Sequence, residues 1–137
     1  MRSNPLHEDA PYFQGQVIEA YTRGNFVDLA HAARITLVET YREGGAWFKA
    51  NAGESKRKAK ALVQLHREKV RESMYELTLY HHARAQSSRK MEDDATAVSW
   101  DQRFIETFPD DPRRKQVQFL LAEIHYDQEN YLQALAD

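Results

Sequence analysis

The chain has 137 residues, with 19 Lys and Arg against 21 Asp and Glu, for a formal net charge of −2. This length suits one compact domain, and the near-neutral charge argues against nucleic-acid binding through phosphates. The chain has no cysteine, which excludes disulfides, thiolate metal sites and thiol nucleophiles. Hydrophobic residues make up 42% of the chain and charged residues 29%, so we expect a folded protein.

The two ends of the chain give separate expectations. Residues 1–10 are polar and are expected to be flexible, with no signal peptide, and the helical domain is expected over residues 11–137. No stretch approaches the roughly 20 apolar residues that cross a bilayer. The segment Tyr131–Asp137 stops after about two helical turns without a stop signal. We interpret Asp137 as a cut within a longer protein and Met1 as an added start, in which case a targeting signal could have been removed with the N-terminus of the parent.

Apolar residues recur at helical spacing, and no stretch alternates as a strand does. The longest helix, of about 33 residues, exceeds the usual length of about 11–12. The helices are expected from Pro11 to Thr22, from Phe26 to Gly44-Gly45, from Ser55 to about Ser87, from Asp93 or Asp94 to Pro109, from Asp111-Pro112 to a turn at Asp127–Asn130, and from Tyr131 onward, with a further turn at Ala46–Phe48.

The same spacing predicts which side chains face inward. These are Val17, Ile18 and Tyr21; then Phe26, Leu29, Ala30, Ala33, Leu37 and Tyr41; then Ala59, Leu62, Val63, His66, Val70, Met74, Leu77, Tyr80 and His81; then Ala97, Trp100, Phe104 and Phe108; and finally Val117, Leu120, Leu121 and Ile124. Of the remaining aromatics, Tyr12, Phe13, Trp47 and Phe48 lie near connectors and offer either core packing or an exposed apolar patch.

Two helix–turn–helix junctions look alike, at Ala20–Phe26 and at His125–Tyr131. In each, a Tyr lies five residues before an aromatic, Asn directly precedes that aromatic, and a small or apolar residue follows three positions later. The junctions lie 105 residues apart, close to three periods of about 34.

With this pattern the chain resembles the tetratricopeptide repeat family. Ala97–Pro112 looks like the second helix of one repeat with its closing proline, and the Phe108–Pro112 junction is similar to repeats of Gram-negative envelope proteins. Departures are also present: Glu129 stands where Gly is usual, Gln118 stands at the usual Trp position, and residues 46–89 show no recognisable repeat. The repeat that would follow Ala97–Pro112 is matched at Leu121, Ala122, Tyr126, Tyr131 and Ala134.

The helical spacing predicts an all-α fold of about five to six helices with one long central helix, and the resemblance implies that they stack as antiparallel pairs in a right-handed superhelix. The resemblance also implies a non-catalytic scaffold that binds other proteins or peptides without a cofactor, in the bacterial periplasm or on an outer-membrane lipoprotein. The concave face would be lined by first helices, with contacts at Gln14, Glu19, Gln118 and Glu123. The final helix would leave Leu132 and Leu135 uncovered, which predicts self-association.

Two other functions stay open. One is a metal-binding bundle around His66, His81 and Glu76, although adjacent His81 and His82 point about 100° apart and lack the i, i+4 spacing of helical metal pairs. His66 and His81 also suggest a pH-dependent interface. His125 is expected to pack between helices, whereas His31 and His7 are expected to be exposed.

The other function is a basic docking surface for an acidic protein or an anionic membrane. Residues 55–72 carry seven basic and two acidic side chains. A solvated helix face explains the same pattern, and the absence of interleaved aromatics disfavours nucleic acid. Acids at 92–94 and 110–111 precede helices and are explained by capping. The candidate contacts of the basic surface are Lys56, Arg57, Lys60 and Arg67.

Overall fold

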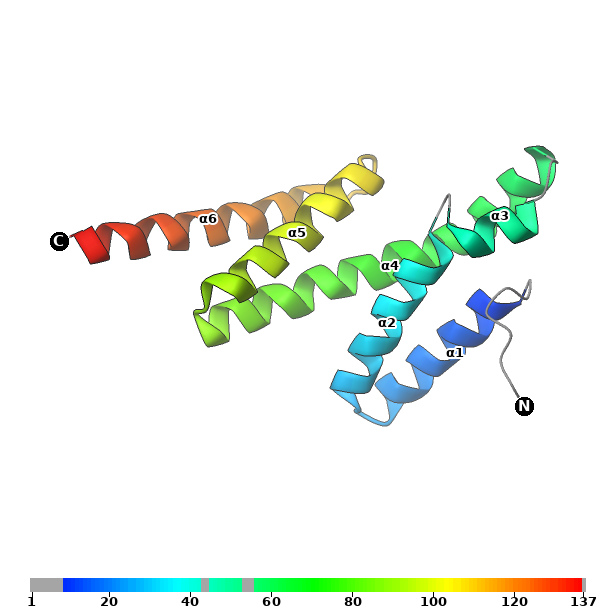
Figure 1. Cartoon of the computed structure of the whole chain (residues 1–137), viewed down its shortest axis with the longest axis horizontal. Helices are drawn as coiled ribbons and strands as arrows, with labels where there is room; N and C mark the ends of the chain where they lie inside the picture. The colour runs from blue at the N-terminus through cyan, green and yellow to red at the C-terminus, as the bar shows by residue number, and fades with distance from the viewer. Residues whose placement is uncertain (1–8, 43–44, 53–55, 137) are drawn as a thin grey trace. The chain divides into compact units, whose positions relative to one another are not determined.

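The computed structural model describes residues 9–42, 45–52 and 56–136, and these ranges contain six helices and no strand. The all-α class and the long central helix are therefore confirmed. None of the helices in the described ranges combines the length and the apolar character that a membrane span requires. The helices are α1 (Ala10–Arg23), α2 (Val27–Tyr41), α3 (Ala46–Ala52), α4 (Lys56–Ser88), α5 (Met91–Thr107) and α6 (Arg114–Ala136), as labelled in Figure 1.

The chain divides into two compact units whose boundary falls inside α4. The N-terminal unit comprises residues 1–74 and the C-terminal unit comprises residues 75–137. Each unit is described below by itself.

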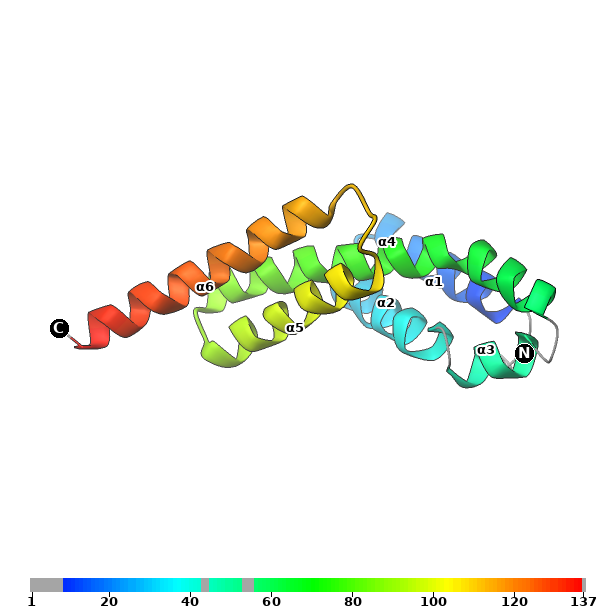
Figure 2. The same ribbon diagram turned by 90° about the horizontal axis from the view of Figure 1, so that it is seen from above.

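In the N-terminal unit, α1 and α2 form an antiparallel hairpin and lie side by side in Figures 1 and 2. The break between them is where the sequence predicts it. The N–H of Gly24 donates to the carbonyl of Ala20 at 3.0 Å, and Asn25 adopts a left-handed φ of 62°. A Cβ on Gly24 would lie 2.7 Å from the ring of Phe26, so any larger residue at this position would displace that ring.

The core of the N-terminal unit is centred on Trp47, which α3 contributes and which is almost fully buried. Its ring packs edge-on against Tyr41 of α2, with centroids 5.6 Å apart, and against His66 of α4 at 5.2 Å. Three helices are thus joined by one indole. The buried positions of α2 are Ala30, Ala33, Leu37, Val38 and Tyr41.

Two of the inward positions predicted for α2 are wrong. Phe26 and Leu29 are about half exposed. Phe26 precedes the first residue of α2 and turns back onto Tyr21 of α1, with ring centroids 6.5 Å apart, so it covers the edge of the hairpin and not its centre. Tyr12 and Phe13 on α1 are also exposed, as the apolar-patch alternative expects.

In the C-terminal unit, α5 and α6 form a second antiparallel hairpin packed on the end of α4 (Figures 1 and 2). Phe104 of α5 is completely buried and contacts Tyr75 of α4. Further along, the small side chains of Ala85 and Ala97 meet Ile124 in one buried cluster. Alanine at both positions lets three helices approach closely.

The connection from α5 to α6 confirms the predicted restart at Asp111. One carboxylate oxygen of Asp111 accepts a hydrogen bond from the backbone N–H of Arg113 at 2.8 Å and from its guanidinium at 3.1 Å. The same guanidinium lies 4.4 Å from the centre of the Tyr75 ring. Asp111 therefore both starts the turn and holds Arg113 against α4.

The predicted turn at 127–130 is wrong, because α6 runs without interruption from Arg114 to Ala136. This stretch reads Asp-Gln-Glu-Asn and contains neither Gly nor Pro, so nothing in it breaks a helix flanked by good helix formers. Of the two similar junctions, only the first is a helix–turn–helix. His125, expected to pack, is exposed, as is Phe119.

The link between α4 and α5 is also shorter than expected. Helix α4 ends at Ser88 and α5 begins at Met91, where Asp93 and Asp94 fall in the first turn. The two-residue link works because Arg89 adopts a left-handed φ of 56°. The Ser88 hydroxyl donates to Asp93 at 2.6 Å and fixes the start of α5.

Candidate functional site

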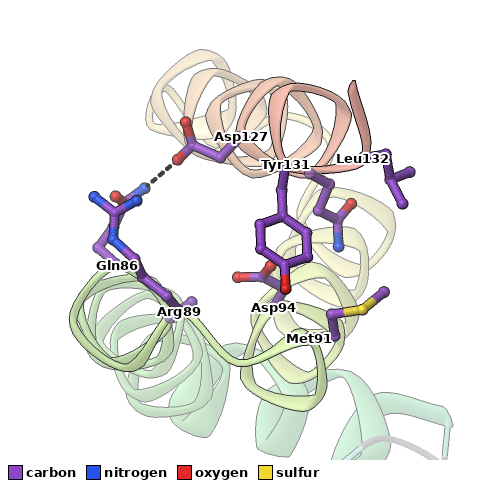
Figure 3. A pocket seen from close by; sticks show the side chains of 9 residues that line it. Gln86, Arg89, Met91, Asp94, Asp127, Tyr131 and Leu132 are labelled. Atoms are coloured by element: carbon purple, nitrogen blue, oxygen red, sulfur yellow. Dashed lines mark hydrogen bonds between the residues drawn. The ribbon is translucent and has the colours of Figure 1, made fainter. Parts of the chain in front are cut away.

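A groove opens in the C-terminal unit where the end of α4, the start of α5 and the second half of α6 diverge from their common core (Figure 3). Its volume is about 360 Å³. The groove is lined by Ala85, Gln86, Arg89, Met91, Asp94, Asp127, Gln128, Tyr131 and Leu132.

The position of the groove follows from the register of α5 against α6. Ala97 packs near Ile124, and Asp94 lies near Asp127 one turn further along both helices. By this antiparallel register the first residue of α5 is level with Asn130. Helix α6 continues to Ala136 and therefore projects past α5, as Figure 2 shows.

One face of α6 changes from core to surface along its length. Residues at 117, 121, 124, 128, 131 and 135 lie within a sector of about 80° around the helix, at 3.6 residues per turn. Val117 and Ile124 are buried in the unit, whereas Tyr131 and Leu135 are 54% and 67% exposed. Leu132, adjacent to this face, is 57% exposed. The apolar face that builds the core thus continues into solvent beside the groove.

The polar residues of the groove are mostly acidic. The pKa of Asp94 is raised, first by burial and then by the negative charges of Asp127 and Asp93, while a hydrogen bond from Gln128 opposes the shift. The amide of Gln86 donates to Asp127 at 3.1 Å. Figure 3 shows the Tyr131 ring pointing from α6 toward Asp94.

Positive charge is scarce around these acids. Arg89 is the basic residue among those that line the groove. The sequence has no Lys or Arg from residue 116 to residue 137, whereas Glu123, Asp127 and Glu129 lie in that stretch of α6. An apolar face beside a group of carboxylates that outnumber the basic residues is suited to a ligand that brings both apolar and positively charged groups.

A second unusual carboxylate, Asp101, lies away from the groove in the core of the C-terminal unit. It is completely buried, and neither oxygen has a hydrogen-bond partner among the described residues. Burial raises the pKa of Asp101 to about 7. The sequence analysis missed this residue, although its place in the row with Ala97, Phe104 and Phe108 was a signal that could have identified it.

The contact residues predicted from the family resemblance are divided between the two units. Gln14 donates its amide to the carbonyl of Ala33 at 3.0 Å, so it ties α1 to α2. Glu19 pairs with Arg23 on the exposed face of α1. In the C-terminal unit, Gln118 is exposed on α6.

Glu123, the fourth predicted contact, is held by its own unit. Its carboxylate lies 3.1 Å from Nε2 of His82 on α4. Gln118 and Glu123 are five residues apart on one helix and so point in directions about 140° apart. They do not share a face of α6.

Part of the predicted basic surface is a row along α4 in the N-terminal unit. Lys60 and Arg67 border a shallow depression of about 380 Å³ together with Gln64, Glu68 and Arg71. Arg71 lies 3.4 Å from Glu68, which reduces the net charge of the row. Arg57 is exposed, and the side chain of Lys56 lies outside the described residues.

The histidines of the metal hypothesis have other environments. His66 packs on Trp47, and burial, followed by the charge of Lys69, lowers its pKa while Asp9 opposes the shift. His81 stacks on Trp100, with ring centroids 6.1 Å apart. Within the described ranges, no three His, Asp or Glu side chains are placed to share a metal ion.

Comparison of the sequence with protein-family models, with curated proteins and with solved structures gives no match.

Proposed function

We propose that the chain is a non-catalytic protein-interaction module that binds a helical segment of a partner in the groove of the C-terminal unit. The observation that carries this proposal is the continuation of the α6 core face into solvent. Tyr131 follows Ile124 by seven residues, as Ile124 follows Val117, and Leu135 lies one turn further on the same face. No helix among the described residues covers Tyr131 and Leu135 as α5 covers the earlier turns.

A partner helix is the ligand that fits such a face. Helix-in-groove recognition reads apolar side chains at i, i+3, i+4 and i+7. Leu132 and Met91 line the groove from α6 and α5 and are exposed, and Leu135 extends the exposed apolar surface of α6 by one turn beyond Tyr131. A helix lying there would restore to the last turns of α6 the packing that its first turns already have.

The scaffold function implied by the resemblance to tetratricopeptide repeats agrees with this proposal, since stacked helix pairs present surfaces for peptides. The proposal itself depends on the groove and not on the number of repeats.

The test uses a designed amphipathic peptide of about five turns, with a Leu row and uncharged Gln flanks, labelled for fluorescence anisotropy. We expect the unaltered chain to bind it and the double variant Leu132→Asp, Leu135→Asp to lose binding at least tenfold. The matched control is Val27→Asp, Leu65→Asp, which places the same charges at exposed apolar positions of the N-terminal unit. Equal loss in the control, or no binding by the unaltered chain, contradicts the proposal.

A further inference from the structure

We infer that the helix bound in the groove of the C-terminal unit is basic, with Lys or Arg flanking its apolar row. This inference rests on the proposed function, and it names the chemistry of the partner. It is carried by the charge that surrounds the exposed apolar face of α6.

Carboxylates face the groove from both α5 and α6. Asp94 projects from α5 and Asp127 from α6, close enough for the negative charge of Asp127 to raise the pKa of Asp94. Both line the same groove. A cation placed between them would interact favourably with both, whereas an anion would meet two like charges.

The carboxylates of Asp94 and Asp127 interact with neutral amides, and Arg89 is the one cation among the described residues that line the groove. Asp127 accepts a hydrogen bond from the neutral amide of Gln86, and Asp94 interacts with the neutral amide of Gln128. Neither amide supplies the positive charge that would lower the pKa of Asp94. The burial and the like charges that raise this pKa would both be offset by a Lys or Arg from the partner.

The charge of α6 disfavours a second copy of α6 as the occupant. Two α6 helices packed antiparallel through Tyr131 and Leu135 would bring together stretches that carry only negative charge, because residues 116–137 contain no Lys or Arg. Like charges across a contact oppose association. The same rule favours a partner of opposite charge.

The experiment compares three peptides with the same Leu row and with Lys, Gln or Glu flanks, binding to the full chain at low salt and at about 0.5 M salt. We expect the Lys peptide to bind about tenfold more tightly than the Gln peptide at low salt, the effect of two or three exposed ion pairs. The advantage should largely disappear at high salt, where screening extends over only a few ångströms.

The variant Asp94→Asn, Asp127→Asn tests which carboxylates are responsible. Asparagine keeps the shape and can still accept from Gln86, so the groove should remain while the Lys preference falls to about twofold. The matched control, Glu106→Gln, Asp110→Asn, removes two exposed acids from the other end of α5 and the loop that follows it.

The outcomes separate the two proposals. Equal binding of all three peptides, sensitive to Leu135→Asp, would overturn the basic partner and retain the groove. A Lys preference lost equally in both carboxylate variants would reflect net charge alone and would also overturn it. Concentration-dependent dimerisation abolished by Leu135→Asp would assign the groove to a second copy, and no peptide binding would overturn both proposals.

Discussion

Each unit packs a helical hairpin against part of α4, but the two hydrophobic cores are covered in different ways. The N-terminal unit brings α2, α3 and α4 onto Trp47, which is almost fully buried. The C-terminal unit closes tightly around Phe104 and Ile124, but its last helix continues past its neighbours. In the N-terminal unit one large aromatic closes the core, whereas in the C-terminal unit the core face of the last helix continues as an exposed face among the described residues.

The units also differ in charge. Residues 1–74 carry 12 basic and 9 acidic side chains, and residues 75–137 carry 7 basic and 12 acidic side chains. The acidic unit is the one with the open groove and with the buried carboxylate Asp101. The near-neutral total therefore conceals a separation of charge along the chain, and the partner chemistry has to be read from each unit alone.

The largest effect is expected from removing the centre of the N-terminal core. Trp47→Ala should destabilise the N-terminal unit by about 3–5 kcal/mol, the usual cost of deleting a buried aromatic. Hydrogen exchange followed by mass spectrometry would show whether α1 and α2 lose protection while α5 and α6 keep theirs. The control Phe119→Ala removes a largely exposed ring and should change little. Equal loss of protection in both units would show that they unfold together.

The next effect concerns Asp101 and depends on pH. Because the pKa of Asp101 is raised in the folded state to about 7 from 3.8, the folded state holds a proton that the unfolded state releases. The resulting loss of stability develops as pH rises from about 4 to about 7. Asp101→Asn has no ionisable group at this position, so it should abolish this pH-dependent loss of stability. We expect it to stabilise the chain at pH 8 by at most about 4 kcal/mol, because the shift of about three pKa units corresponds to 1.36 kcal/mol per unit.

Urea unfolding at pH 4.5 and pH 8 measures this difference for the original chain and for Asp101→Asn. The control Asp110→Asn removes an exposed acid nearby in the sequence. A gain in stability that is the same at both pH values would indicate that the charge of Asp101 is not responsible.

A smaller effect is expected for the hydrogen bond between α1 and α2. Gln14→Ala removes a partly buried donor to the Ala33 carbonyl and should cost about 1 kcal/mol. Gln16→Ala, at an exposed position on the same helix, is the control. Thermal unfolding distinguishes the two variants, and no difference between them would mean that Gln14 is available for the partner contact that the family resemblance implies.

The smallest effect on folding stability is expected for His66, because the charge of Asp9 opposes the burial and the Lys69 charge that lower the pKa of His66. Its pKa is lowered in the folded state, so the unfolded state binds a proton more readily below the ordinary value of 6.5. Stability is therefore lost as pH falls through and below that value. His66→Asn should reduce this loss between pH 8 and pH 5 in urea unfolding, and His125→Asn, at an exposed position, should not.

Most of the helices could be predicted because their signals are local. Gly24 and Asn25 break the chain where a left-handed residue is needed, and Asp111 starts a turn with its own carboxylate. The turn predicted at 127–130 shows the limit of such reasoning. Similarity to the first junction suggested it, but without Gly or Pro the helix continues.

The groove could not be predicted in the same way, because it depends on register between helices. Leu132 and Leu135 were expected to be uncovered, and they are exposed. The approach of Asp94 to Asp127, however, follows from the packing of Ala97 near Ile124, which is a tertiary contact. In the sequence, the acids at 92–94 indicate only the capping of a helix N-terminus.

The left-handed backbone of Arg89 has a consequence for engineering. A side chain with a Cβ costs about 1–2 kcal/mol in this conformation, and glycine avoids that cost. Arg89→Gly would therefore make the link between α4 and α5 more favourable while removing a positive charge from the groove. A screen that selects only for heat resistance would favour this substitution. The selected variants would then differ in ligand preference, although binding was never selected.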